Sequence, residues 1–207
     1  MLQNIHNILN NYKPISLEEM DSVKLMDRTD TKFTFHINHL PQVLELAKKY
    51  YTVFEINNKR ISDYRTLYYD TADLDMYNIH HTGKLNRYKV RHRTYVDSNL
   101  GFLEVKYKNN KGKTFKSRIK EPEVLKIWNG ESVQFLLKKT LYISDTLVPA
   151  LWVNYSRITL VSVETKERLT LDLNLEFKKG DIDQKLHKLV IAEVKQEKAK
   201  GSPFIGI

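Results

Sequence analysis

The chain has 207 residues, of which 41% are hydrophobic and 29% are charged, and it contains no cysteine. These values are typical of one globular domain, and they exclude a disulfide framework, cysteine-ligated zinc and a cysteine nucleophile. The net charge of +9 favours a polyanionic partner. No apolar run approaches the roughly 20 residues of a membrane span, and the N-terminus lacks the features of a signal peptide, so the sequence predicts a soluble, cytoplasmic protein.

Helix signals occur at three places along the chain. The capping box of Ser16 and Glu19 predicts a helix near 16–25. Asn38 is predicted to cap a second helix that extends to about residue 50, and apolar spacing predicts a third near 131–140. These helices are short and well separated in the sequence.

The rest of the chain alternates polar and apolar residues with the period of a β-strand. This pattern predicts eight strands, near 28–36, 64–70, 86–96, 102–109, 114–120, 151–163, 167–177 and 188–196. Short turns join several of them, which favours antiparallel pairing. No linker or repeat divides the sequence, so we expect a single α+β domain over 1–207 with an eight-stranded antiparallel sheet.

One face of the strands 86–96, 102–109 and 114–120 is rich in basic residues: Arg87, Lys89, Arg91, Arg93, Lys106, Lys108, Lys116, Arg118 and Lys120. An open sheet with one solvated face is the simpler explanation. However, like charges directly across strands are destabilising, and an anion would compensate them. The alternative is a closed barrel with a charged lumen and an apolar outer wall covered by helices.

Common catalytic motifs are absent. Gly112-Lys113-Thr114 lacks the upstream glycine of a P-loop, because Tyr107 stands there, and this stretch is predicted to be a hairpin turn. His80 and His81 are interpreted as a solvated helix end. The carboxylates Glu104, Glu176 and Glu193 are candidate ligands of Mg²⁺ or Mn²⁺, or else each neutralises a cross-strand Lys or Arg.

Seven short motifs in order resemble the VTC domain, the polyphosphate polymerase branch of the triphosphate tunnel metalloenzymes in the CYTH-like superfamily. They are Asp27-Arg28-Thr29-Asp30-Thr31-Lys32-Phe33, Tyr68-Tyr69-Asp70-Thr71, Lys89-Val90-Arg91-His92-Arg93-Thr94-Tyr95, Leu103-Glu104-Val105-Lys106, Asn154-Tyr155-Ser156-Arg157, Arg168-Leu169-Thr170-Leu171-Asp172 and Ala192-Glu193-Val194-Lys195. The resemblance implies an eight-stranded tunnel that binds triphosphate with Mn²⁺ or Mg²⁺. It also implies transfer of the ATP γ-phosphate to a growing polyphosphate chain.

Roles follow from this resemblance residue by residue. The phosphate clamps would be Arg91, Arg93, Lys106, Arg157 and Arg168. Further substrate ligands would be Arg28, Lys32, Lys89, Lys116, Arg118 and Lys195. Glu193 would be the metal ligand, with Glu104 as a second candidate. Members of the family continue past the last strand into a helix, whereas this chain ends at Ile207, so the C-terminal helix is expected to be missing.

Two other functions remain open on the residues alone. A triphosphatase of the same fold would transfer the phosphate to water, and a non-catalytic module would bind a polyanion without turnover. Nucleic acid is disfavoured, because Tyr88 and Tyr107 fall opposite the basic face and provide no stacking surface beside it.

Overall fold

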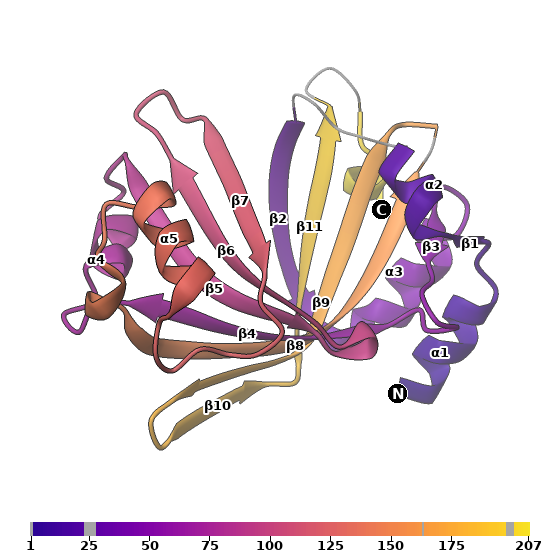
Figure 1. The fold of residues 1–207 in the computed structure, drawn as a ribbon. Coiled ribbons are helices and arrows are strands. Elements are labelled where there is room, and N and C mark those ends of the chain that lie inside the picture. Colours follow the sequence, from indigo (N-terminus) through magenta and orange to yellow (C-terminus); the bar gives the residue numbers. More distant parts are fainter. Residues whose placement is uncertain (1, 23–27, 163, 198–200) are drawn as a thin grey trace. The chain divides into compact units, whose positions relative to one another are not determined.

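The structure, a computed structural model, describes residues 2–22, 28–162, 164–197 and 201–207 (Figure 1). Its contacts divide the chain into two compact units. Unit 1 comprises Met1–Asp63, Tyr155–Leu175 and Lys185–Ile207, and unit 2 comprises Tyr64–Asn154 and Glu176–Gln184. Strands β8 and β9 contribute residues to both units.

Unit 1 combines helices with an antiparallel sheet. Its helices are α1 (Leu2–Asn10), α2 (Leu17–Ser22) and α3 (Leu40–Ala47), and its strands are β1 (Pro14–Ile15), β2 (Arg28–His36), β3 (Thr52–Phe54), β11 (Leu189–Glu197) and parts of β8 (Val148–Ser162) and β9 (Glu167–Lys179). The neighbour order is β2–β11–β9–β8, and β3 pairs with β8. β2 and β9 both run antiparallel to β11, and β1 is parallel to β3.

Unit 2 has the same kind of architecture. It contains most of β4 (Ser62–Asp70), together with β5 (Arg87–Tyr95), β6 (Leu100–Lys108), β7 (Thr114–Lys120), α4 (Asp75–His81) and α5 (Gly130–Lys139). The strands lie in the order β8–β4–β5–β6–β7, and β10 (Ile182–Leu186) pairs with β9. The pairs β4–β5, β5–β6 and β6–β7 are antiparallel.

All eight predicted strands are present, as β2, β4, β5, β6, β7, β8, β9 and β11. The α+β class with a large antiparallel sheet is confirmed, and closure into a barrel stays a prediction. The structure adds the short strands β1, β3 and β10 and the helix α1, which the sequence did not predict, and it gives the bounds of α4, of which only an end at His80 and His81 was predicted. The three strands are too short for a clear periodic signal, whereas α1 carries Ile5, Ile8 and Leu9 at helical spacing and was missed.

All three predicted helices are present, as α2, α3 and α5, although residues 23–25 of the first prediction lie outside the described residues. Of the two predicted N-terminal caps, one is confirmed and one was wrong. The capping box is confirmed, since Ser16 N–H donates to Glu19 at 2.8 Å and Glu19 N–H donates to Ser16 Oγ at 3.2 Å. The prediction that Asn38 is a cap was wrong. Asn38 lies within a 3₁₀ turn (Ile37–His39), and its own N–H donates to His36 Nδ1 at 3.2 Å. The helix α3 then begins at Leu40, with Pro41 in its first turn.

The core of unit 1 lies between its helices and the apolar face of its sheet. Leucines of β9 at alternate positions, with the apolar residues of β8 and β11, contact α1 and α3. The fully buried members of this core are Ile5, Leu9, Leu40, Leu44, Ala47, Val53, Ile158, Leu160, Leu169, Leu171, Leu173, Val190, Ala192 and Val194. Because side chains alternate along a strand, burial of this face leaves the polar residues of the same strands on the other face.

Unit 2 is built in the same way around a second core. Leu67, Val90, Leu103 and Val105 of β4, β5 and β6 pack with Met76 of α4 and with Phe135 and Leu136 of α5 (Figure 1). In each unit, therefore, helices cover the apolar face of the sheet.

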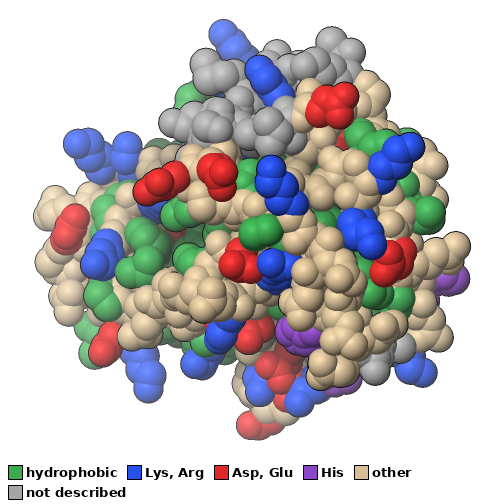
Figure 2. All heavy atoms as spheres, turned by 90° about the vertical axis from the view of Figure 1, so that its right-hand side faces the viewer, with side chains coloured by type: hydrophobic (Ala, Val, Ile, Leu, Met, Phe, Trp, Pro, Cys, Tyr) green, Lys and Arg blue, Asp and Glu red, His purple; other side chains and the backbone are tan. Residues whose placement is uncertain are grey.

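Charged side chains also intermix on the outer surface. Figure 2 views the side that carries α1, α2 and α3 in Figure 1, and Lys and Arg alternate there with Asp, Glu and apolar side chains. Among the residues drawn in colour, no charge of one sign gathers on this face. The basic residues that alternate along β5, β6 and β7 lie instead on the polar face of those strands.

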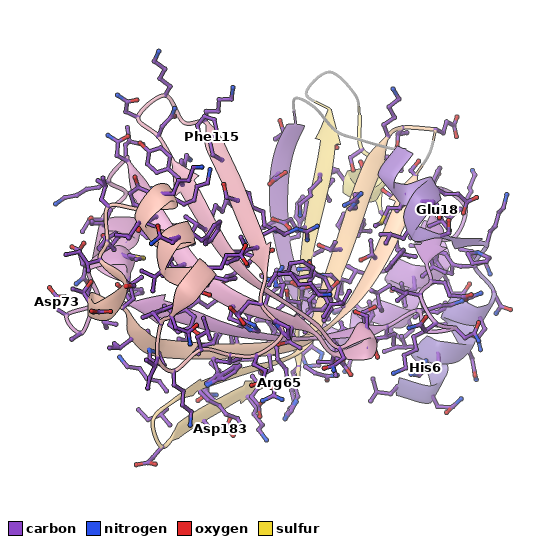
Figure 3. All side chains as sticks on the ribbon, in the orientation of Figure 1. His6, Glu18, Arg65, Asp73, Phe115 and Asp183 are labelled. Atoms are coloured by element: carbon purple, nitrogen blue, oxygen red, sulfur yellow. The ribbon has the colours of Figure 1, made fainter. Side chains whose placement is uncertain are left out.

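The start of α4 explains one of the sequence motifs. Asp70 is buried at the end of β4, and its carboxylate accepts hydrogen bonds from the N–H groups of Thr71, Met76 and Tyr77 at 2.8–2.9 Å. Thr71 also donates to Asp73 at 2.6 Å in the turn that leads into the helix (Figure 3). The Tyr68-Tyr69-Asp70-Thr71 motif thus supplies the N-terminal cap of α4.

The turn between β6 and β7 confirms that the Gly-Lys-Thr stretch is not a P-loop. Asn109 N–H donates to the Lys113 carbonyl at 3.0 Å, and Asn109 Oδ1 accepts from Lys111 and Lys113 N–H. Gly112 takes φ +74°, which a hairpin turn of this kind requires. The stretch is a hairpin turn closed by its own side chain.

Gly101 in β6 allows the segment after β7 to cross close to the sheet. A Cβ at this position would lie 2.1 Å from the carbonyl oxygen of Glu121. That carbonyl is fixed by buried His92, whose Nε2 lies 2.8 Å from it, and Glu121 N–H donates to Gly101 at 2.9 Å. Any side chain at position 101 would push the backbone of β6 away from the backbone at Glu121.

We expect Gly101→Ala to lower the free energy of unfolding by about 2–3 kcal/mol, because the backbone around Glu121 must move. Urea unfolding of both proteins measures the difference. The control is Gly112→Asn in the exposed hairpin, where nothing lies within 4 Å and asparagine tolerates a positive φ, so its effect should stay within about 0.5 kcal/mol. Equal effects of the two changes would contradict the close approach.

Candidate functional site

The polar face of β5, β6 and β7 carries rows of cations that the strand register brings side by side. Lys106 lies directly across from Lys89 on one side and Lys116 on the other, so three lysines form one row. Arg87 likewise faces Lys108. Like charges in direct cross-strand pairs are destabilising by roughly 0.2–1 kcal/mol each. This face therefore carries an electrostatic cost in the absence of a counter-anion.

Glu104 occupies the centre of the next row, between Arg91 and Arg118. Its side chain is only 2% exposed; one oxygen accepts from Arg91 Nε at 2.8 Å, and the other lies 2.6 Å from Lys116 Nζ. Burial raises the pKa of Glu104, but the attraction of Arg91 and Lys116 outweighs it and holds the pKa below the usual 4.5. The sequence left two roles open for Glu104, a metal ligand or a partner of cross-strand cations, and these contacts favour the second.

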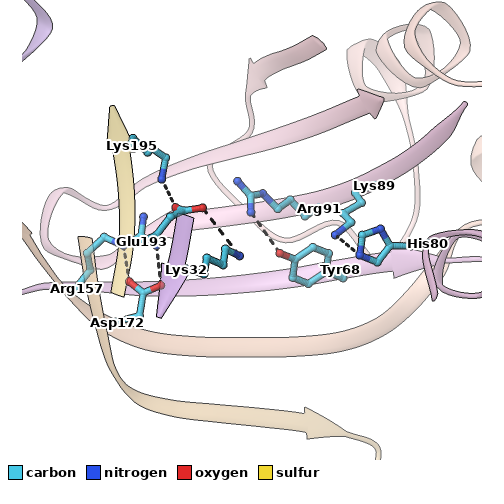
Figure 4. A network of polar contacts seen from close by, with 9 residues as sticks. All are labelled: Lys32, Tyr68, His80, Lys89, Arg91, Arg157, Asp172, Glu193 and Lys195. Carbon is cyan, nitrogen blue, oxygen red and sulfur yellow. Dashed lines mark hydrogen bonds and ion pairs between the residues drawn. The ribbon is translucent and has the colours of Figure 1, made fainter. Parts of the chain in front are cut away.

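Tyr68 of β4 lies among the cations of this face, directly across from Arg91. Its hydroxyl accepts from Arg91 at 3.3 Å (Figure 4). Burial raises the pKa of the Tyr68 phenol, but the charges of Arg91, Arg93 and Lys89 lower it below its usual value of 10.0. The single carboxylate of Glu104 therefore leaves the face positive.

The remaining predicted residues of unit 2 also lie on this face. Arg93 is 9% exposed, donates to Thr66 at 3.3 Å and lies over the ring of Tyr64. Arg118 lies over the ring of Phe102 at 4.5 Å. Lys106 is exposed, and Lys89 Nζ lies 3.3 Å from His80 Nε2 (Figure 4). The structure thus brings together Lys89, Arg91, Arg93, Glu104, Lys106, Lys116 and Arg118.

Tyr88 and Tyr107 lie on the face opposite the cations, as predicted. They form a row with Phe115 across β5, β6 and β7, with ring centroids 4.7 and 6.3 Å apart. Phe115 is labelled on β7 in Figure 3. They alternate with the cations along each strand, so this aromatic row does not stand beside the basic residues. On the cationic face itself, Phe102 lies across from Arg93 and under Arg118, and Tyr64 lies under Arg93, so aromatic rings do stand beside some of the cations.

The polar face of unit 1 has a different charge pattern, in which acids and bases alternate. Glu193 of β11 lies across from Lys32 of β2, 3.9 Å from its ammonium group, and also pairs with Lys195 (Figure 4). Burial raises the pKa of Glu193, but Lys195, Lys32 and Arg157 lower it below the usual 4.5. This carboxylate is therefore ionised at neutral pH.

Arg157 and Arg168 complete this face. Arg157 of β8 binds Asp172 of β9 with two hydrogen bonds, at 2.6 and 2.8 Å, which holds its guanidinium in a fixed plane (Figure 4). Arg168 lies directly across from Lys195. Arg28 begins β2, but its side chain lies outside the described residues.

The three candidate carboxylates, Glu104, Glu176 and Glu193, differ in how well their surroundings would allow them to bind a metal ion. Within the described ranges, no group of three or more His, Asp or Glu side chains could hold an ion. Glu176 accepts from Asn154 at 2.8 Å and pairs with Lys178, and Glu104 lies between two cations. Mg²⁺ is often held by one or two carboxylates together with substrate phosphates, so the half-buried Glu193 is the candidate whose surroundings fit.

Sequence reasoning missed two residues of the unit 2 face. Tyr68 contacts Arg91, and His80 contacts Lys89 from the last turn of α4. Burial and the charges of Lys89 and Arg87 lower the pKa of His80 below 6.5, so it is neutral at pH 7. The sequence marked His80 only as part of a solvated helix end, and nothing in its local pattern indicated the contact with Lys89.

A family model described as the VTC domain matches residues 27–205. No curated protein matches the chain. Among solved structures, an adenylate cyclase candidate from Bacillus halodurans has a TM-score of 0.50 at 15% identity and covers 82% of each chain. A candidate adenylyl cyclase from Hippeastrum, described as having a dominant triphosphatase activity, has a TM-score of 0.48 at 14% identity, over 84% of this chain and 80% of that one. The first likeness supports the fold.

Among the described helices, none is both long and apolar enough to cross a membrane.

We expect Glu104→Gln to lower the free energy of unfolding by about 2 kcal/mol or more at pH 7, because Arg91 and Lys116 lose their shared counter-charge. Folding lowers the pKa of the Glu104 carboxyl below its usual value of 4.5. The contribution of the ionised carboxylate to the free energy of unfolding is therefore fully present above pH 4.5, and it is lost as the pH falls through the lower pKa of the folded state. Urea unfolding at pH 7 and pH 3 should show the two proteins converging in acid. Exposed Glu123→Gln is the control and should change little at either pH.

Proposed function

Because the chain belongs to the VTC domain family, we propose that it binds the triphosphate of ATP, or polyphosphate, on the charged faces of its strands and transfers the ATP γ-phosphate to a growing polyphosphate chain. Closure of the sheet into the family's eight-stranded tunnel is part of this proposal. In the reaction, the bond from the γ-phosphorus to its bridging oxygen breaks, a bond to a terminal oxygen of the chain forms, and ADP leaves.

The observation that carries the proposal is the row of Lys89, Lys106 and Lys116, beside a single carboxylate, Glu104, that is shared between Arg91 and Lys116. A triphosphate supplies several negative charges along a line, and ammonium and guanidinium groups bind phosphate oxygens by charge-assisted hydrogen bonds. Phosphoryl transfer depends mainly on positioning and charge neutralisation, so no nucleophilic side chain is needed.

A divalent ion fits this proposal through Glu193. The ion would be Mn²⁺ or Mg²⁺, held by the ionised carboxylate together with phosphate oxygens, and it would neutralise charge on the transferring group. Lys195 and Lys32 now contact the same carboxylate, so the ion would compete with two ammonium groups. This competition favours metal binding with the substrate rather than before it.

Product analysis tests the activity directly. The protein is incubated with ATP and Mn²⁺, and the products are resolved by size. Long phosphate chains support the polymerase, free phosphate alone indicates a triphosphatase of the same fold, and unchanged ATP with measurable affinity indicates a binding module. The last two outcomes would overturn the proposed transfer reaction.

We expect Lys106→Ala to weaken tripolyphosphate binding by about 1.5–3 kcal/mol, the contribution of a hydrogen bond to a charged group. The same change should leave the stability of the ligand-free protein unchanged or slightly higher, because it removes repulsion from Lys89 and Lys116. Calorimetric titration and thermal unfolding measure the two effects.

Lys138→Ala, on the exposed surface of α5, is the matched control, since it removes the same charge at a distance from the lysine row. If both variants bind tripolyphosphate with equal affinity, the row is an ordinary solvated surface and the assignment is wrong.

We expect Glu193→Gln to lower the affinity of the protein–tripolyphosphate complex for Mn²⁺ at least about tenfold, because the variant keeps the side chain's shape but loses its charge. Binding of tripolyphosphate without metal should be retained. Electron paramagnetic resonance of free Mn²⁺ measures the first quantity, and Glu176→Gln serves as the control carboxylate. Loss of stability with unchanged Mn²⁺ affinity would make Glu193 a purely structural partner of Lys195 and Lys32.

A further inference from the structure

Unit 2 contains a cavity of about 470 Å³ beside the cationic face. Its wall comes from β4, α4, β5, β8 and β9, and the lining residues are Tyr68, Tyr69, Asp70, Leu74, Met76, Tyr77, His80, Lys89, Ala150, Leu151 and Lys179. All of them belong to unit 2. The volume falls in the range of roughly 300–1,000 Å³ that is usual for small-molecule sites.

Two residues belong both to this cavity and to the cationic face. Tyr68 lines the cavity and accepts a hydrogen bond from Arg91, and Lys89 lines it and opens the lysine row with Lys106. A ligand that filled the cavity would therefore have the cations of β5 and β6 as its immediate neighbours. The two features form one continuous site.

The chemistry of the wall selects an uncharged aromatic ring. Three tyrosines, with Leu74, Met76 and Leu151, supply flat and apolar surface. The one carboxylate, Asp70, is engaged by three backbone N–H groups as the cap of α4. His80 is neutral at pH 7, so its ring offers polar nitrogen atoms without adding charge. The cations Lys89 and Lys179 are the charged groups that remain on the wall.

We propose that this cavity holds the nucleobase of a nucleoside triphosphate whose phosphates lie on the lysine row, an assignment that rests on the proposed triphosphate binding. An aromatic ring attached to a polyanion matches an aromatic wall that adjoins cations. The cavity then makes the protein prefer ATP over bare tripolyphosphate. The same cavity gives no such advantage to polyphosphate, which has no ring to place in it.

Substitution of Ala150 tests this assignment, because its small side chain lies on the cavity wall. Ala150→Trp places an indole in the cavity, and it should weaken binding of ATP at least about tenfold while leaving the affinity for tripolyphosphate unchanged. Val148→Trp is the control, since Val148 is exposed on the same strand outside the lining. Calorimetric titration of each protein with ATP and with tripolyphosphate, without metal, gives the four affinities.

A second variant guards against misfolding of the first. Tyr77→Ala removes an aromatic wall at a side chain that is 56% exposed, and thermal unfolding verifies that it folds. It should also lower the affinity for ATP selectively. Equal affinities of the unchanged protein for ATP and tripolyphosphate, or equal losses of both in the variants, would overturn the nucleobase assignment. Absence of tripolyphosphate binding to the unchanged protein would instead overturn the proposed function.

Discussion

Burial of the apolar face of β5 and β6 is the constraint on which the architecture of unit 2 depends. Lys89, Lys106 and Lys116 are held in one cross-strand row, and their mutual repulsion opposes that register. The register is fixed from the other side of the same strands, where Val90, Leu103 and Val105 are buried under α4 and α5. A shift by one residue would expose this apolar face, so burial holds the cations together against their repulsion.

The carboxylate of Glu104 offsets part of the repulsion between the cations of this face. It is the most buried charged group of the face and is shared by Arg91 and Lys116, which fixes the positions of both. The cations of this face, among them Lys89 and Lys106, outnumber this one carboxylate. The polar face of unit 1 follows another principle, because Glu193 and Asp172 pair there with Lys195, Lys32 and Arg157. The cationic face of unit 2 has one carboxylate among its cations, whereas in unit 1 acids and bases alternate and pair.

The Asp70 cap connects the fold to the site. By binding the N–H groups at the start of α4, it places the last turn of that helix, with His80, against Lys89. The same geometry puts Leu74, Met76 and Tyr77 on the wall of the cavity. A short helix that carries little of the core thus joins the aromatic cavity to the lysine row. Its first turn is also held by Thr71 Oγ1, which accepts from Asp75 N–H at 3.0 Å, and by Tyr142, which donates to Asp75.

The sequence by itself determined the strands, their two faces and the basic character of one of them, because alternation along a strand is a local property that 86–96 and 102–109 display directly. It also determined the capping box at Ser16 and the hairpin at Asn109, which close within a few residues. Only the tertiary structure decided that Lys106 stands between two lysines while Glu104 stands between two arginines, since cross-strand register is set by burial of distant apolar residues. The cavity likewise gathers residues from 68 to 179, and no periodic pattern in the sequence encodes a wall assembled from such separate segments.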